Sequence, residues 1–237
     1  MGHMSVDPAW TAARRDVIRS AISIGLAVAV YGVSFGALGV ASGFTVAQTQ
    51  GLSLLMFTGA SQFALVSTVA AGGTMLAAVA AAMLLGTRNA AYSLRMAQPL
   101  RVRGLRRVLA SHLTIDESTA MGLSRDEQAF DGRAQRLAFW ATGLSVFVFW
   151  NAATLIGAVT VNAIGDPKAY GLDAAIAAGL FALVWPQLAG RQTAVVAMGG
   201  ATVALLLTPV LPAGVPVLAA AVVAIVAGWS WAKQVSI

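Results

Sequence analysis

The chain has 237 residues, of which 58% are hydrophobic and only 10% are charged, whereas ordinary globular domains carry about 25% charged residues. So few charges cannot cover a water-exposed surface, which argues against a soluble protein, and the absence of cysteine excludes disulfides and cysteine-based metal sites. The net charge of +6 is typical of Lys and Arg collecting in cytoplasmic loops rather than of nucleic-acid binding. We predict an all-α polytopic membrane protein with six or seven transmembrane helices, without a metal or cofactor.

The N-terminal segment, residues 1–19, is predicted to be cytoplasmic, with a cloning scar at 1–4 and with Arg14, Arg15 and Arg19 at the membrane edge. No charged residue follows until Arg88. Because a transmembrane helix needs roughly 20 mostly apolar residues, we expect apolar segments at 20–43, 51–72, 74–98, 137–160, 172–190, 192–210 and 214–232. Glycines in the first of these favour close helix packing, because small residues let backbones approach in lipid.

The first membrane half, residues 20–98, poses a topological conflict. Three full spans before a cytoplasmic loop would place the arginines of the N-terminal segment outside, against the positive-inside rule. Either the rule fails there, or one segment is re-entrant or broken and does not fully cross. The polar interruption Thr58-Gly59-Ala60-Ser61-Gln62 points to the segment 51–72.

Residues 99–136 are predicted to form a basic cytoplasmic loop, and 137–237 the second membrane half. Tryptophans mostly near the predicted span ends are interpreted as interfacial anchors; they are Trp140, Trp150, Trp185, Trp229 and Trp231. Segments 51–73 and 171–200 share a Gln at a helix breaker and a terminal Gly pair. This pattern suggests inverted repeats with broken helices, a common plan of secondary transporters.

Arg88 is the outstanding polar candidate in the apolar segments. A charge at membrane depth must face protein or water, and a guanidinium suits a substrate carboxylate through its planar donor fork. The alternatives are a structural buried pair or an arginine that snorkels towards the helix end. At 1.5 Å per residue, however, the end of this helix lies roughly 15 Å away, a long reach for snorkelling.

The interruption at Thr58–Gln62 is a second candidate, because a broken helix can hold an amino acid's carboxylate at a helix N-terminus and its ammonium group at carbonyls. Ser61 and Gln62 would add side-chain hydrogen bonds, whereas the alternative is helix packing with a satisfied glutamine. Trp185-Pro186-Gln187 is either a proline kink or the second-half counterpart that lines the same cavity.

Acidic residues and a histidine at 112–117 form the last candidate. Asp116 and Glu117 either lie in a solvated loop or fold back into the mouth of the protein, where Asp116 could meet a substrate ammonium group or Arg88. His112 lies close in sequence, and a carboxylate near a histidine suits proton coupling, because small shifts place histidine near physiological pH.

These motifs together resemble those of the AzlC family of branched-chain amino-acid exporters, over about residues 20–232. Phe57-Thr58-Gly59-Ala60-Ser61-Gln62-Phe63 is close to the family's F-x-G-A-S-Q-F, and Thr87–Tyr92 resembles its L-R-H-x-x-Y element, with Asn89 where the family has His. Thr114–Glu117 resembles a T-D-E element with one extra residue, and Pro186-Gln187-Leu188 resembles the second half. The resemblance implies substrate-binding roles for Gly59, Ser61, Gln62, Arg88, Asn89, Tyr92 and Gln187, with His112, Asp116 and Glu117 as coupling candidates.

The expected function is proton-coupled, secondary active export of valine, leucine, isoleucine or analogues across the bacterial inner membrane. The resemblance also implies a small AzlD-like membrane subunit as partner. The alternatives are a non-transporting assembly or sensor subunit, or a transporter of another small amino acid. An intramembrane enzyme is disfavoured, because the predicted spans contain no His and, apart from Asp173 at the start of 172–190, no Asp or Glu for metal or acid–base chemistry.

Overall fold

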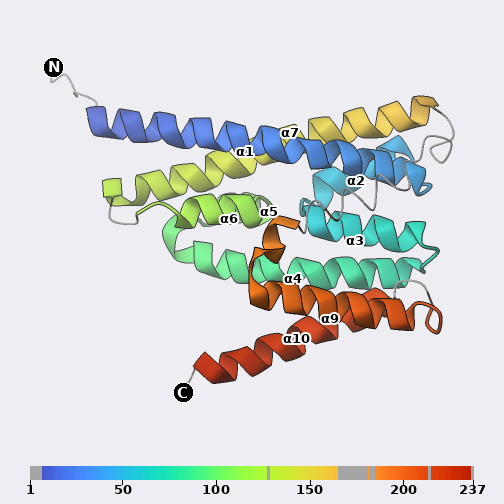
Figure 1. Cartoon of the computed structure of the whole chain (residues 1–237). Coiled ribbons are helices and arrows are strands. Elements are labelled where there is room, and N and C mark those ends of the chain that lie inside the picture. Colours follow the sequence, from blue (N-terminus) through green and yellow to red (C-terminus); the bar gives the residue numbers. More distant parts are fainter. Residues whose placement is uncertain (1–6, 127–128, 165–180, 182–184, 213–214, 236–237) are drawn as a thin grey trace.

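The computed structural model describes residues 7–126, 129–164, 181, 185–212 and 215–235, and the regular elements in these ranges are all helices (Figure 1). In chain order they are α1 (Pro8–Ala41), α2 (Val46–Leu55), α3 (Gly59–Ala70), α4 (Met75–Leu100), α5 (Leu105–His112), α6 (Asp116–Leu123), η1 (Ala129–Gly132), α7 (Arg133–Ile164), η3 (Trp185–Ala189), α9 (Arg191–Leu207) and α10 (Val215–Val235). The predicted all-α class is confirmed.

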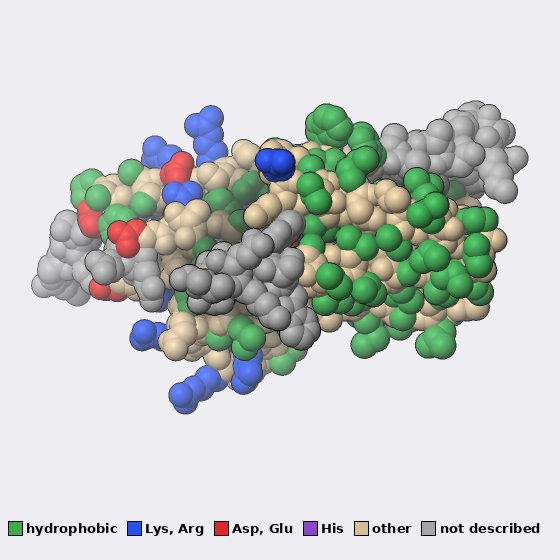
Figure 2. Space-filling model, turned by 60° about the horizontal axis from the view of Figure 1, so that its bottom comes forward, with side chains coloured by type: hydrophobic (Ala, Val, Ile, Leu, Met, Phe, Trp, Pro, Cys, Tyr) green, Lys and Arg blue, Asp and Glu red, His purple; other side chains and the backbone are tan. Residues whose placement is uncertain are grey.

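Three helices among the described residues are long and apolar enough to cross a membrane: α1, α4 and the stretch Phe130–Ala163 that contains α7. The shorter apolar helices Arg191–Leu207 and Leu218–Gly228 follow. The predicted count of six or seven spans is therefore not confirmed. Figure 2 shows hydrophobic side chains covering one part of the surface, while most charged side chains gather towards the other end. This separation is the one that a bilayer imposes on a helical membrane protein.

Helices α1 and α7 run parallel and touch backbone to backbone. A Cβ atom added at Gly32 would lie 3.0 Å from the Trp150 carbonyl oxygen, and one at Gly36 would overlap the carbonyl oxygen of Thr154. In the reverse direction, a Cβ at Gly157 would overlap the Val33 carbonyl oxygen. The prediction of close packing through the glycines of the first span is confirmed, and the two helices share an interface without intervening side chains at these points.

Helices α2 and α3 form a re-entrant pair. Figure 1 shows that α1 ends at the same end of the molecule where α3 ends and α4 begins, so the chain between them enters and returns. At 1.5 Å per residue, α2 and α3 are roughly 15 and 18 Å long, about half of a 30 Å hydrocarbon core. The N-terminus of α1 and the end of α4 consequently lie at the same end of the molecule (Figure 1), which brings Arg14, Arg15 and Arg19 to the side of the 99–136 arginines.

The position of the break differs slightly from the prediction. The chain leaves the helical conformation at Met56–Thr58, and α3 begins at Gly59, so that Ser61 and Gln62 belong to the first turn of a helix. The segment 51–72 therefore does not fully cross, as the charge distribution suggested.

The segment 99–136, predicted to be a loop, contains the short helices α5 and α6. Its helices α5 and α6 fold back against the bundle, and α6 lies against α4 and α7, since a Cβ at Gly122 would meet Met96 at 2.8 Å and Phe139 at 3.5 Å. This is the alternative in which the segment folds back and Asp116 meets Arg88, with the Asp116 side chain still partly exposed. The second copy of the suggested repeat, 171–200, lies largely outside the described residues, and inverted repeats remain a prediction.

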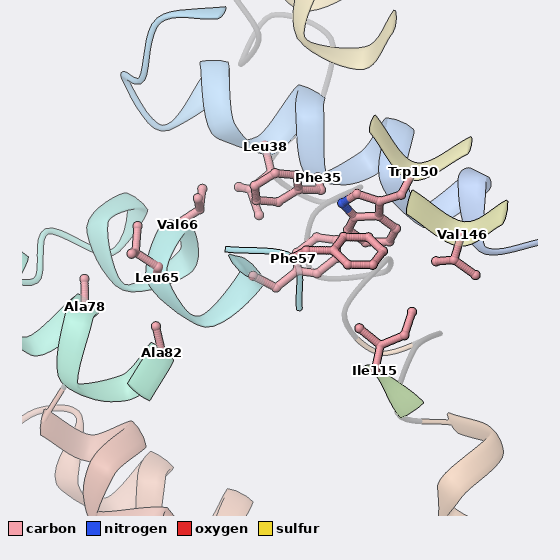
Figure 3. Close-up of a cluster of buried hydrophobic side chains, with 11 residues drawn as sticks. Phe35, Leu38, Phe57, Leu65, Val66, Ala78, Ala82, Ile115, Val146 and Trp150 are labelled. Carbon is pink, nitrogen blue, oxygen red and sulfur yellow. The ribbon is translucent and has the colours of Figure 1, made fainter. Parts of the chain in front are cut away.

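The interpretation of Trp150 as an interfacial anchor is wrong. Trp150 lies near the middle of α7, is 4% exposed, and stacks on Phe35 with 6.1 Å between ring centroids. Figure 3 shows its indole beside Phe35 and Phe57, within a cluster of buried hydrophobic side chains. Glycine-rich α1 leaves room for this large ring, which fills the space between α1, α3 and α7.

Candidate functional site

A cavity of about 450 Å³ lies where the N-termini of α3 and α6 meet the middle of α4. This volume is within the range of small-molecule sites, roughly 300–1,000 Å³. Its polar lining comes from the first turns of α3 and α6 and from α4, while α1 and α7 supply an apolar and aromatic wall. The lining residues are Val28, Tyr31, Phe57, Thr58, Gly59, Ala60, Leu85, Arg88, Ile115, Asp116, Glu117, Val146 and Trp150.

The N-terminus of α3 opens onto the cavity. Its N-cap residue Thr58 is extended and makes no side-chain cap hydrogen bond, and the first N–H groups of any helix lack partners within the helix. The Trp150 ring lies close to this N-terminus, since a Cβ atom added at Gly59 would be only 3.2 Å from it. The cavity is therefore narrow beside Gly59. Free N–H groups and the positive end of the helix dipole together favour an anionic group such as a carboxylate.

Arg88 and Asp116 form an ion pair across the cavity wall. Arg88 Nη1 lies 3.1 Å from Asp116 Oδ2, and the two side chains are 35% and 39% exposed. Arg88 lies near the middle of α4, roughly 18 Å from its last residue at 1.5 Å per residue. Arg88 Nε and Asp116 Oδ1 have no hydrogen-bond partner in the described structure. The pair therefore satisfies only part of each group's bonding capacity, and each retains an atom for a further partner.

Glu117 adds a second carboxylate at the N-terminus of α6, a short helix that does not span the membrane. Withdrawal from water raises the pKa of the Glu117 carboxyl group above the usual glutamate value, and the negative charge of Asp116 adds to the rise. Arg88 acts in the opposite direction and lowers it. Glu117 therefore holds its proton to higher pH than a solvated glutamate does, which is the property required of a proton carrier.

The remaining polar candidates lie around the Arg88–Asp116 pair, but not all of them line the cavity. Tyr92, one turn beyond Arg88 on α4, lies within electrostatic range of Arg88, Asp116 and Glu117. Asn89 is half-buried, and its Oδ1 atom has no partner among the described residues. His112 packs against Phe57, with 5.8 Å between ring centroids, and so lies behind a cavity-lining ring.

Ser61 and Gln62 point away from the cavity. Gln62 is fully buried, and its Nε2 donates to the carbonyl oxygens of Leu52 and Ser53, at 3.2 and 3.4 Å. These bonds tie the first turn of α3 to the C-terminal end of α2. Ser61 is buried against Gly86 of α4. The geometry gives Gln62 a positioning role at the re-entrant turn, and its predicted direct contact with substrate stays a prediction.

Gln187 lies in η3, but its side chain is outside the described structure, so its place relative to the cavity stays a prediction.

The aromatic and aliphatic wall was not predicted. Val28, Tyr31, Val146 and Trp150 look like ordinary apolar residues of a membrane span, and only the crossing of α1 and α7 brings them to one cavity. The site thus combines a helix N-terminus, two carboxylates with one guanidinium, and an apolar wall. It can accept a small zwitterion that carries an apolar side chain.

Half-length helices that meet at a polar cavity within a bundle of long apolar helices are typical of one class of protein, the helical membrane transport proteins. The chain belongs to the AzlC family: the family model described as AzlC protein matches residues 23–164, more than half of the chain and all of the described cavity. This is a transporter-type family rather than an enzyme family. Comparison with curated proteins and with solved structures gives no match.

Proposed function

We propose that this protein is a secondary active exporter of branched-chain amino acids, namely valine, leucine, isoleucine or their analogues. The observation that carries the proposal is the cavity in which the uncapped N-terminus of α3 lies across from the carboxylates of α6. The substrate carboxylate binds the N–H groups at Gly59 and Ala60. Its ammonium group binds the carboxylates of Asp116 and Glu117.

The apolar wall accounts for the side chain of the substrate. Val28, Leu85, Ile115 and Val146 line the cavity and offer aliphatic contacts, and each buried CH₂ group contributes about 0.8 kcal/mol. A branched aliphatic side chain is therefore preferred to glycine or alanine. The ring of Trp150 limits the length that the cavity accepts. In this arrangement Arg88 orients Asp116 and meets substrate through its remaining donors.

The proposal includes the bacterial inner membrane as location, proton coupling through Glu117, and a small AzlD-like membrane subunit as partner. Large apolar side chains remain exposed on the described helices, among them Leu55, Leu76 and Met83 at 83%, 80% and 70%. Lipid covers such side chains in a membrane, and an apolar partner helix would do so equally well.

The transport proposal is tested with purified protein in lipid vesicles, with and without the partner subunit. We expect labelled valine, leucine and isoleucine to move, and glycine to move at least about tenfold more slowly, because two lost CH₂ groups already cost roughly 1.6 kcal/mol. Lysine should also move more slowly, because its side-chain ammonium group would be buried against the apolar wall without a partner. Protein-free vesicles are the control. Equal rates for all amino acids would contradict the branched-chain assignment, and no flux in either preparation would favour a non-transporting subunit.

Proton coupling is tested with the Glu117→Gln variant. Because the pKa of Glu117 is raised, an acidic compartment loads the carboxyl group at a pH where a solvated glutamate, with a pKa of about 4.3, is still ionised. Wild-type valine flux should therefore increase with an imposed pH gradient, and the variant should respond to it several-fold less. Exchange of labelled for unlabelled valine, which needs no net proton movement, is affected less.

The matched control for this experiment is Asp131→Asn, which neutralises an exposed carboxylate outside the cavity. It should keep the wild-type response to the gradient. A Glu117→Gln protein that follows the pH gradient as the wild type does would contradict the assignment of Glu117 as proton carrier.

A further inference from the structure

A cluster of arginines lies at the corner between α4 and α5. Arg101, Arg103, Arg106 and Arg107 are all exposed, and no described carboxylate forms an ion pair with any of them, because the two ion pairs found in the described structure involve Arg88 and Arg125. This corner belongs to the charged end of the molecule, the end at which α4 finishes and α1 begins (Figures 1 and 2). Among the described residues, the positive charge at this corner is therefore concentrated without a counter-charge.

Helix α5 is amphipathic, with an apolar face that no described residue covers. Leu105, Val108 and Leu109 are 74%, 64% and 48% exposed. They recur at the three- and four-residue spacing that places side chains on one face of a helix. Arginines alternate with them, so that α5 presents hydrocarbon contacts and positive charge to the same environment. This combination is typical of helices that lie at the boundary between lipid headgroups and acyl chains.

A second cavity, of about 350 Å³, separates α4 from α5. Leu94, Met96, Leu100 and Val102 provide apolar lining, while Arg107 and Ser111 provide polar lining. This cavity does not belong to the central site, with which it shares no lining residue. An apolar slot with a guanidinium matches the two parts of a phospholipid, the acyl chain and the phosphate.

From these three observations we infer that the α4–α5 corner is a binding site for an anionic phospholipid. The phosphate of the headgroup is bound by Arg106 and Arg107, and an acyl chain enters the cavity between α4 and α5. Charge complementarity selects the occupant, since four arginines without an ion-pair partner among the described residues favour an anionic headgroup over a zwitterionic one. Because α5 leads through Leu113–Ile115 to Asp116, the bound lipid also holds in place the helix pair that carries the carboxylates of the central site.

The inference is tested by thermal unfolding of the purified full-length protein in detergent, titrated with phosphatidylglycerol or with phosphatidylcholine of the same acyl chains. We expect phosphatidylglycerol alone to raise the midpoint of unfolding. In the Arg106→Gln/Arg107→Gln variant the concentration of phosphatidylglycerol needed should increase roughly 30-fold, because each arginine near a membrane contributes about a factor of five. The matched control, Arg14→Gln/Arg15→Gln, removes the same charge from exposed positions on α1 and should behave as the wild type.

Two further measurements distinguish a bound phospholipid from binding of phosphate by charge alone. Ala97→Phe fills the cavity without a change of charge, and it should also weaken stabilisation by phosphatidylglycerol, since Ala97 lines the slot. Inorganic phosphate at matched ionic strength should have no effect. Any of four results would overturn the assignment. The two lipids could stabilise equally, or the two double variants could behave alike. Ala97→Phe could respond as the wild type does, or phosphate alone could stabilise fully. No arm measures transport, so failure of the proposed function leaves this test intact.

Discussion

The Arg88→Ala variant is expected to lose valine export by roughly 30-fold or more. A substrate in the cavity would displace water from the pair, and truncating one member of a buried hydrogen-bonded charge pair costs a binding interaction about 2–5 kcal/mol. A loss of 2 kcal/mol already corresponds to roughly 30-fold. Without Arg88, the Asp116 carboxylate loses its partner at 3.1 Å and is free to turn away from the cavity. It can then no longer present a fixed negative charge to a substrate ammonium group.

The loss should come from the site rather than from unfolding. Both side chains of the pair are more than a third exposed, and such a solvent-screened pair contributes at most about 1 kcal/mol to folding. Thermal unfolding of the variant, measured beside its flux, should therefore change little. Arg95→Ala is the matched control, because Arg95 lies on the same helix, is exposed and does not line the cavity.

The coupling between the two residues is measured with a double-mutant cycle on Arg88→Ala and Asp116→Ala. We expect the double variant to be little worse than either single variant, because both substitutions remove the same interaction. Wild-type flux in Arg88→Ala would show that the pair has no role in transport and would remove Arg88 from the site.

The second large effect is expected for Gly36→Ala. The added methyl group would overlap the Thr154 carbonyl oxygen of α7, and a backbone atom cannot rotate away as a side chain can. Relief requires α1 and α7 to separate, which also disturbs the packing of Phe35 on Trp150. Overpacking of this kind costs about 1–3 kcal/mol, so we expect a lower midpoint of thermal unfolding and a lower yield of folded protein.

Two substitutions control for the general effect of replacing glycine. Gly157→Ala meets the Val33 carbonyl oxygen from the opposite side of the same contact and should destabilise similarly. Gly51→Ala, in α2, has no heavy atom within 4 Å of the added methyl group. It should leave stability unchanged or raise it by up to about 1 kcal/mol, because alanine loses less backbone entropy in a helix. A Gly36→Ala protein as stable as Gly51→Ala would contradict the backbone contact.

The arrangement of the first half could be predicted from charge and apolar length. The charge-free run before Arg88 indicated buried helices, and the arginines at its start conflicted with three full crossings. The conflict itself pointed to the segment that does not cross. The helices α5 and α6 could not be predicted in the same way, because eight-residue helices of mixed composition carry too short a periodic pattern. Their tertiary contacts with α4 and α7 determine them.

The sequence predicted which residues belong to the candidate site better than it predicted how these residues are arranged. Arg88 and Asp116 were expected to meet under one of the alternatives, and they do. The motif containing Gly59, Ser61 and Gln62 indicated a polar break, but sequence spacing does not say which face of the new helix looks into a cavity. Gly59 faces it and Gln62 faces α2. Trp150 was misplaced because an aromatic residue in a long apolar run has no sequence signal for depth.

The parallel contact between α1 and α7 has a mechanical consequence. Sliding one helix along the other would drive the carbonyl groups of Thr154 and Val33 into the opposing backbone, so the two helices move as a single rigid body. The opposite wall of the cavity is held less tightly. The ion pair between α6 and α4 is partly exposed, and the two cavities described above flank this junction. A motion that opens the cavity to one side and then to the other is therefore expected to leave the contact between α1 and α7 intact and to change the position of α4 relative to it.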